Sequence, residues 1–160
     1  MALLTAKEVF QFAARIEENG ERFYRAFAEN LTGSLEKELF VYLANEEVTH
    51  KKTFEDLSDS IQDTKPTVGY PDEYSSYLQA YTDNLIFMED TIKKEVVKIK
   101  NAKEACEFGI RRELDSILYY QEIKDFLPEK ERDHIDTIIG EERQHFIKLS
   151  EMKKKFEQNS

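Results

Sequence analysis

Apolar side chains recur along four stretches of the chain at alternating intervals of three and four residues. This spacing places them along one face of an α-helix. Thr5 and Asn101 are each followed three residues later by a glutamate, which is the pattern of a capping box at a helix start. Four long helices are therefore predicted, at about residues 6–30, 34–60, 101–127 and 128–156, with Ser34 as the N-cap of the second and Pro128 in the first turn of the fourth.

The segment between the second and third helices, residues 61–100, has a different character. It contains Pro66, Gly69 and Pro71, and tyrosines recur in it at steps of four, three and four: Tyr70, Tyr74, Tyr77 and Tyr81. We expect a short helix here whose tyrosines pack on the bundle or form a subunit interface. Short connections within each helix pair predict antiparallel neighbours, and the long segment is a crossover between the pairs. The expected fold is an all-α antiparallel four-helix bundle, with residues 1–160 as one domain.

Composition narrows the classes of function. The net charge of −10 argues against nucleic acid and anionic membranes, which both require clustered Lys and Arg. Cys106 is the single cysteine, so neither an internal disulfide nor a cysteine-ligated iron or zinc site can form. We interpret Cys106 as a buried small apolar residue. No apolar run has the length of a membrane span, and no signal peptide is recognisable, so a cytoplasmic protein is expected.

Each apolar stripe carries one glutamate at mid-length, and two stripes add a histidine one turn later. These residues are Glu17, Glu47 with His50, Glu113, and Glu142 with His145. Burying four carboxylates without a counter-charge is strongly unfavourable. A pair of divalent metal ions would supply that charge, and carboxylate oxygen with imidazole nitrogen suits iron, manganese or zinc.

An internal repeat relates the two helix pairs. Glu17 and Glu113 are 96 residues apart, as are Tyr24 and Tyr120, whereas His50 and His145 are 95 apart. The repeat covers about residues 5–60 and 101–157. Two related helix pairs would place three ligands each around a pseudo-twofold axis, so a dinuclear site is predicted.

A third Glu-x-x-His pair, Glu131 and His134, shows that this motif alone is weak. The pair lies in the first turns after Pro128 and has no counterpart in the first half. We interpret His134 as a surface histidine and exclude it from the site.

Two Glu-bearing helices alternating with two Glu-x-x-His helices resemble the ferritin-like di-iron carboxylate superfamily. The seven-residue spacing from Glu17 to Tyr24 and the long crossover are most similar to its rubrerythrin-type branch. The resemblance implies a ferritin-like bundle with two iron ions bound by the six residues above, one or more glutamates bridging. It also implies an oxidoreductase that reacts Fe(II) with hydrogen peroxide or oxygen, and raises the expectation that Tyr24 and Tyr120 hydrogen-bond to the carboxylates.

Two departures from that branch matter. Without further cysteines the chain cannot build a rubredoxin domain, so electrons would come from a separate donor protein. Rubrerythrins also carry an extra glutamate where this chain has Ser116, and the remaining four-Glu, two-His set is closer to the bacterioferritin pattern. Glu46 and Glu141, which precede ligand glutamates, are expected in solvent or at the bundle boundary.

Two alternatives stay open at the level of sequence. One is a ferroxidase that handles iron in a cage, which would share the same ligands. The other is a non-catalytic bundle with a structural metal such as zinc, in which the tyrosine stripe would be the functional surface. A homodimer is expected from the tyrosine stripe and from the habit of the family.

Overall fold

The computed structural model describes residues 5–61, 72–85, 89–127 and 129–159. Over these residues the secondary structure is entirely helical. The helices are α1 (Ala6–Asn30), α2 (Ser34–Ser60), α3 (Asp72–Leu85), α4 (Glu89–Lys98), α5 (Ala102–Ile123) and α6 (Arg132–Gln158), with short 3₁₀ turns η1 (Lys124–Phe126) and η2 (Glu129–Glu131) between the last two.

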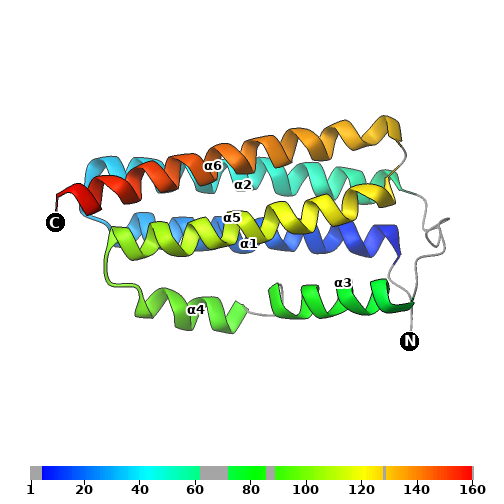
Figure 1. Ribbon diagram of the computed structural model, residues 1–160, viewed down its shortest axis with the longest axis horizontal. Helices are drawn as coiled ribbons and strands as arrows, with labels where there is room; N and C mark the ends of the chain where they lie inside the picture. The colour runs from blue at the N-terminus through cyan, green and yellow to red at the C-terminus, as the bar shows by residue number, and fades with distance from the viewer. Residues whose placement is uncertain (1–4, 62–71, 86–88, 128, 160) are drawn as a thin grey trace.

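The four long helices form an antiparallel bundle, as predicted (Figure 1). α1 packs along α2, and α5 packs along α6. The helices α3 and α4 follow one another along the side formed by α1 and α5, and so carry the chain back to the end where α5 begins (Figure 1). The crossover thus contains two helices rather than the single short helix expected from the tyrosine pattern.

The helix boundaries follow local hydrogen bonding. The Thr5 hydroxyl accepts the Glu8 amide at 3.2 Å, and the Glu8 carboxylate accepts the Thr5 amide at 2.8 Å, which completes the predicted capping box. The Asn101 side chain caps α5 by accepting the backbone N–H of Glu104. The Glu104 carboxylate accepts the backbone N–H of Lys100, where a capping box would have that of Asn101. Other boundaries differ slightly from prediction: Gly33 rather than Ser34 is the N-cap of α2, α5 ends at Ile123, and Pro128 lies outside the described residues.

Two apolar clusters fill the bundle on either side of its middle. One includes Phe10, Ala13, Phe54, Tyr120 and Ile135, and the other includes Phe23, Phe40, Leu43, Cys106 and Leu149. Cys106 is fully buried, which confirms its interpretation as a core residue, and burial raises the pKa of its thiol to about 12. In each long helix the predicted ligands fall between members of the two clusters, so apolar layers enclose the charged middle.

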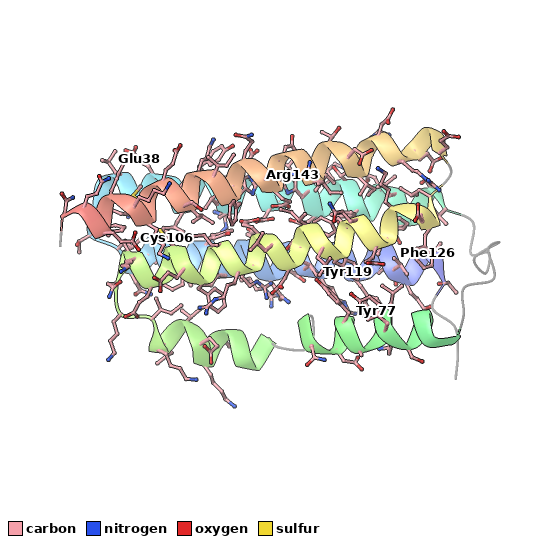
Figure 2. The ribbon with its side chains drawn as sticks, viewed as in Figure 1. Glu38, Tyr77, Cys106, Tyr119, Phe126 and Arg143 are labelled. Atoms are coloured by element: carbon pink, nitrogen blue, oxygen red, sulfur yellow. The ribbon has the colours of Figure 1, made fainter. Side chains whose placement is uncertain are left out.

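The described part of the tyrosine stripe packs on the bundle. Tyr77 lies on α3 and Tyr119 on α5 (Figure 2). The Tyr81 ring is in contact with both of these rings. The Tyr81 ring stacks on that of Tyr119 with centroids 5.5 Å apart, and its hydroxyl donates to the Asp115 carbonyl at 2.5 Å. Of the other two tyrosines, Tyr70 and the side chain of Tyr74 lie outside the described residues.

Candidate metal centre

The six side chains predicted as ligands converge at the middle of the bundle, one or two from each long helix. All are buried, with no more than 4% of any residue exposed: Glu17, Glu47, His50, Glu113, Glu142 and His145. The sequence excluded His134, and that residue is indeed on the surface. The helical spacing of each stripe therefore directs carboxylates and imidazoles to one place.

The donor atoms form two overlapping groups, each with its atoms within 4.8 Å of one another. Glu17 and His50 belong to the first group only, and Glu113 and His145 to the second only. Glu47 and Glu142 belong to both groups. The six side chains therefore form two candidate metal-binding groups, each with two residues of its own, and the two groups have two carboxylates in common.

Both imidazoles turn Nδ1 toward the carboxylates. His50 Nδ1 lies 2.9 Å from Glu142 Oε1 and 3.4 Å from Glu17 Oε2. His145 Nδ1 lies 3.1 Å from Glu142 Oε2 and 3.8 Å from Glu113 Oε1. The two rings stack with centroids 5.5 Å apart, so the two imidazoles lie side by side in the cluster.

Several of these buried atoms have no hydrogen-bond partner. They are Glu17 Oε2, Glu142 Oε1 and His50 Nδ1, which approach one another without the alignment of a hydrogen bond. Buried polar atoms are almost always satisfied, and a cation between them would satisfy all three. Gly20 adds to the fit, because a Cβ there would lie 3.2 Å from Glu47 Cδ. The residues present therefore suit a pair of divalent cations.

Comparison with known proteins agrees with this geometry. The family model for rubrerythrin matches residues 8–153. The chain belongs to the rubrerythrin family. It is also 30% identical to a candidate ferritin-like diiron-carboxylate protein from Thermotoga maritima, whose crystal structure superposes with a TM-score of 0.70 over 96% of this chain and 97% of that one. The ferritin-like fold expected from the sequence is thereby confirmed.

Two further results bound this comparison. A search of curated proteins found no match to this rubrerythrin-family chain. Within the described residues, no helix is long and apolar enough to cross a membrane.

Two buried tyrosines link the halves of this rubrerythrin-family site crosswise. The Tyr24 hydroxyl on α1 donates to Glu113 on α5, and the Tyr120 hydroxyl on α5 donates to Glu17 on α1. Burial and the nearby carboxylates raise the pKa of both phenols, so they remain donors. The sequence predicted hydrogen bonds to the carboxylates, but not that each tyrosine serves the glutamate of the other repeat.

Gly109 explains how the Tyr24 ring fits beside α5. A Cβ at Gly109 would lie 3.3 Å from Tyr24 Cε1 and 3.0 Å from Leu149 Cδ1. The close approach of the ring lets its hydroxyl reach Glu113.

The protonation states of the metal-free cluster are strongly coupled. Burial and neighbouring carboxylates raise the pKa of Glu47 and Glu113. Burial acts against the charged forms of Glu142 and both histidines as well. For these groups, contacts with partners of opposite charge outweigh the effect of burial. They lower the pKa of Glu142, raise the pKa of His145 to about 9, and raise the pKa of His50 further. Without metal, the protons therefore supply the positive charge that the carboxylates require.

The contact of Glu141 with the cluster was not predicted. It was expected in solvent or at the bundle boundary, and its side chain is indeed 46% exposed, but its Oε2 lies 2.9 Å from His50 Nε2. A residue one step before a stripe position points about 100° away from it, toward the adjacent helix. No sequence pattern points to this contact, because His50 lies on another helix, α2. Ser116 donates its hydroxyl to the Arg112 carbonyl at 3.0 Å.

Proposed function

We propose that this rubrerythrin-family protein binds two iron ions and acts as an oxidoreductase that reacts Fe(II) with hydrogen peroxide or oxygen. The observation that carries the proposal is the division of the donors into two overlapping groups that share Glu47 and Glu142. Oxygen and imidazole donors suit iron, although manganese or zinc fit the same ligand types. Four carboxylates and two neutral imidazoles would balance the charge of two divalent ions.

The chain's own residues would hold and protect such a centre. Glu17 with His50 would hold one ion, Glu113 with His145 the other, and the shared glutamates both. Bound iron would supply the one-electron redox chemistry that protein side chains lack. Tyr24 and Tyr120 would keep Glu113 and Glu17 oriented by donating their hydroxyl protons, and the apolar clusters on both sides would keep bulk water out.

Electrons for turnover would come from a separate donor protein. With a single cysteine the chain has no thiolate set of its own for a rubredoxin-type iron site. We also propose that the protein is a homodimer in solution. Light scattering would measure its molar mass and so distinguish a dimer from a large assembly.

A ferroxidase that handles iron is a second candidate. Ser116 occupies the place of the extra rubrerythrin glutamate, and its hydroxyl bonds to its own helix rather than to the carboxylates. The four-Glu, two-His set is then compatible with simple Fe(II) oxidation. Storage would require a large hollow assembly, so a dimer in solution would exclude the storage form.

Anaerobic loading with Fe(II) tests the proposal. After desalting, mass spectrometry should find two irons per chain, and addition of peroxide should produce the absorbance band of an oxo-bridged ferric pair. Glu142→Gln should lose both results, whereas Glu131→Ala, which alters the excluded Glu-x-x-His pair, should keep them. The redox di-iron site would be refuted if Glu142→Gln still bound two irons per chain. It would also be refuted if the wild-type protein retained only a zinc ion that iron cannot displace.

A further inference from the structure

The two histidines differ in what their outward-facing nitrogens contact. His50 Nε2 lies 2.9 Å from the Glu141 carboxylate, which reaches it from α6. His145 Nε2 is buried and has no hydrogen-bond partner. The inner ligand sets match between the halves, but this outer contact occurs in one half only.

The repeat identifies the residue that would make the second contact. Glu46 stands 95 residues before Glu141 and is its counterpart, so symmetry would bring it to His145. Glu46 makes no such contact, because His145 Nε2 has no hydrogen-bond partner. Burial first, and then the charge of Glu46, raise the pKa of the Tyr42 phenol. The Tyr42 ring stands edge-on to His145 with centroids 6.2 Å apart. The counterpart of Tyr42 is Thr137, which donates to the Asp133 carbonyl at 2.9 Å, so the repeat does not preserve this aromatic side chain.

We propose that Glu141 is a positioning residue that makes the two metal positions unequal, so that the Glu17–His50 position binds its ion first and more tightly. The proposal rests on the metal site of the proposed function. When Nδ1 binds a metal, the imidazole proton must sit on Nε2. Glu141 accepts that proton for His50, which fixes the tautomer and ring orientation and strengthens the nitrogen as a ligand. At His145 the same N–H would be buried without an acceptor, which disfavours binding.

Anaerobic titration with Co(II), followed by its visible absorbance, measures the two positions without any redox reaction. Wild-type protein should bind two ions in two steps whose dissociation constants differ by about tenfold or more. Loss of an outer partner typically weakens metal binding by about 10- to 100-fold, so Glu141→Ala should weaken the first step by that factor. Glu141→Gln can still accept the N–H and should keep part of the tight step.

Further variants assign the steps. His145→Ala should keep one tight ion, and His50→Ala should keep only the weak one. Glu46→Ala is the matched control, since it removes the repeat counterpart of Glu141 and should change neither step by more than about twofold. Because Glu141 is half-exposed, its variants should keep the circular dichroism of the wild type.

The outcomes separate this inference from the proposed function. Two ions bound with equal affinity, or an unchanged first step in Glu141→Ala, would overturn the inequality while leaving the dinuclear site intact. A larger effect of Glu46→Ala than of Glu141→Ala would overturn it too. Failure of the wild-type protein to bind Co(II) would overturn both the dinuclear site and the inequality.

Discussion

The α1–α2 half and the α5–α6 half of the bundle carry the same ligands in the same order, but different surroundings. The inner positions are alike: Glu17 matches Glu113, and the Glu-x-x-His motif is repeated 95 residues later. The outer positions differ, since Glu141 contacts His50 Nε2 while His145 Nε2 has no hydrogen-bond partner. The six inner side chains are alike in the two halves, whereas the contacts around them differ. Under the inference above, this difference would give two similar ligand sets unequal affinities for metal.

Removing the metals should have the largest effect, and it should act on both halves together. At a hundredfold excess over its dissociation constant, each ion should raise the free energy of unfolding by about 2.7 kcal/mol. Glu47→Gln should abolish most of this gain, because Glu47 belongs to both donor groups. Urea unfolding with Co(II) or with chelator measures the difference.

The chelated proteins provide the control for this experiment. Without metal, Glu47→Gln should be no less stable than the wild type, because burial and like charges already raise the pKa of Glu47. If the variant kept the full metal-dependent gain, Glu47 would not be a shared ligand.

A second prediction concerns the pH dependence of the metal-free protein. The pKa of His145 is raised from 6.5 to about 9, because contacts with Glu113 and Glu142 outweigh the opposing effect of burial. A raised folded-state pKa means that the protonated imidazole stabilises the fold fully below pH 6.5, and that this stabilisation is lost as the pH rises through 9. The loss should be at most about 3 kcal/mol.

The two halves should separate in this experiment. Urea unfolding in the presence of chelator should show the decline between pH 6.5 and 9 in the wild type, and His145→Ala should flatten it. The pKa of His50 is raised further, so its protonated form persists in this window and His50→Ala should keep the decline. An equally steep decline in His145→Ala would contradict the assignment.

The crossed tyrosines allow each half to be perturbed from the other. Tyr24→Phe removes the donor to Glu113, and Tyr120→Phe removes the donor to Glu17. Loss of a hydrogen bond to a buried carboxylate should lower the free energy of unfolding by about 1–3 kcal/mol. With Co(II), Tyr120→Phe should weaken the tight step and Tyr24→Phe the weak one. The reverse pairing, in which each variant affects the position nearest in sequence, would show that the hydrogen bonds do not cross.

Sequence alone predicted the four long helices, the apolar stripes and all six converging side chains, because helical period and buried charge are local properties of the chain. The crossed pairing of Tyr24 and Tyr120 was not predictable in this way, because it depends on how α1 and α5 face each other. Glu141 was missed for the same reason: its partner is on another helix. The second crossover helix was missed because Glu89–Lys98 lacks the tyrosine pattern that marked the first.

The small residues beside the site give a sharper comparison with a smaller effect. Gly20→Ala would place a Cβ 3.2 Å from Glu47 Cδ, so the carboxylate must shift by a few tenths of an ångström. We expect about tenfold weaker Co(II) binding. The metal-free protein should lose little stability, because alanine favours the helix by about 1 kcal/mol over glycine. Ser116 is at the matching position of the second half, which already accommodates a Cβ. Ser116→Ala should therefore leave the Co(II) affinities of both positions unchanged. Equal effects of the two variants would show that Gly20 does not serve to admit Glu47.

The smallest expected effect tests where the comparison of halves ends. The second half contains Glu131 and His134, a Glu-x-x-His pair without a counterpart in the first half, and His134 is exposed. His134→Ala should change neither Co(II) step, and stability should stay within about 0.5 kcal/mol of wild type, as for most surface substitutions. His145→Ala has the same change in side chain on the same helix but should lose one ion. Both histidines belong to a Glu-x-x-His motif. The difference in Co(II) binding between the two variants would therefore measure how much burial and convergence of the ligands contribute to metal binding. A lost Co(II) step in His134→Ala would mean that the motif alone, rather than its place in the apolar stripe, directs the metal.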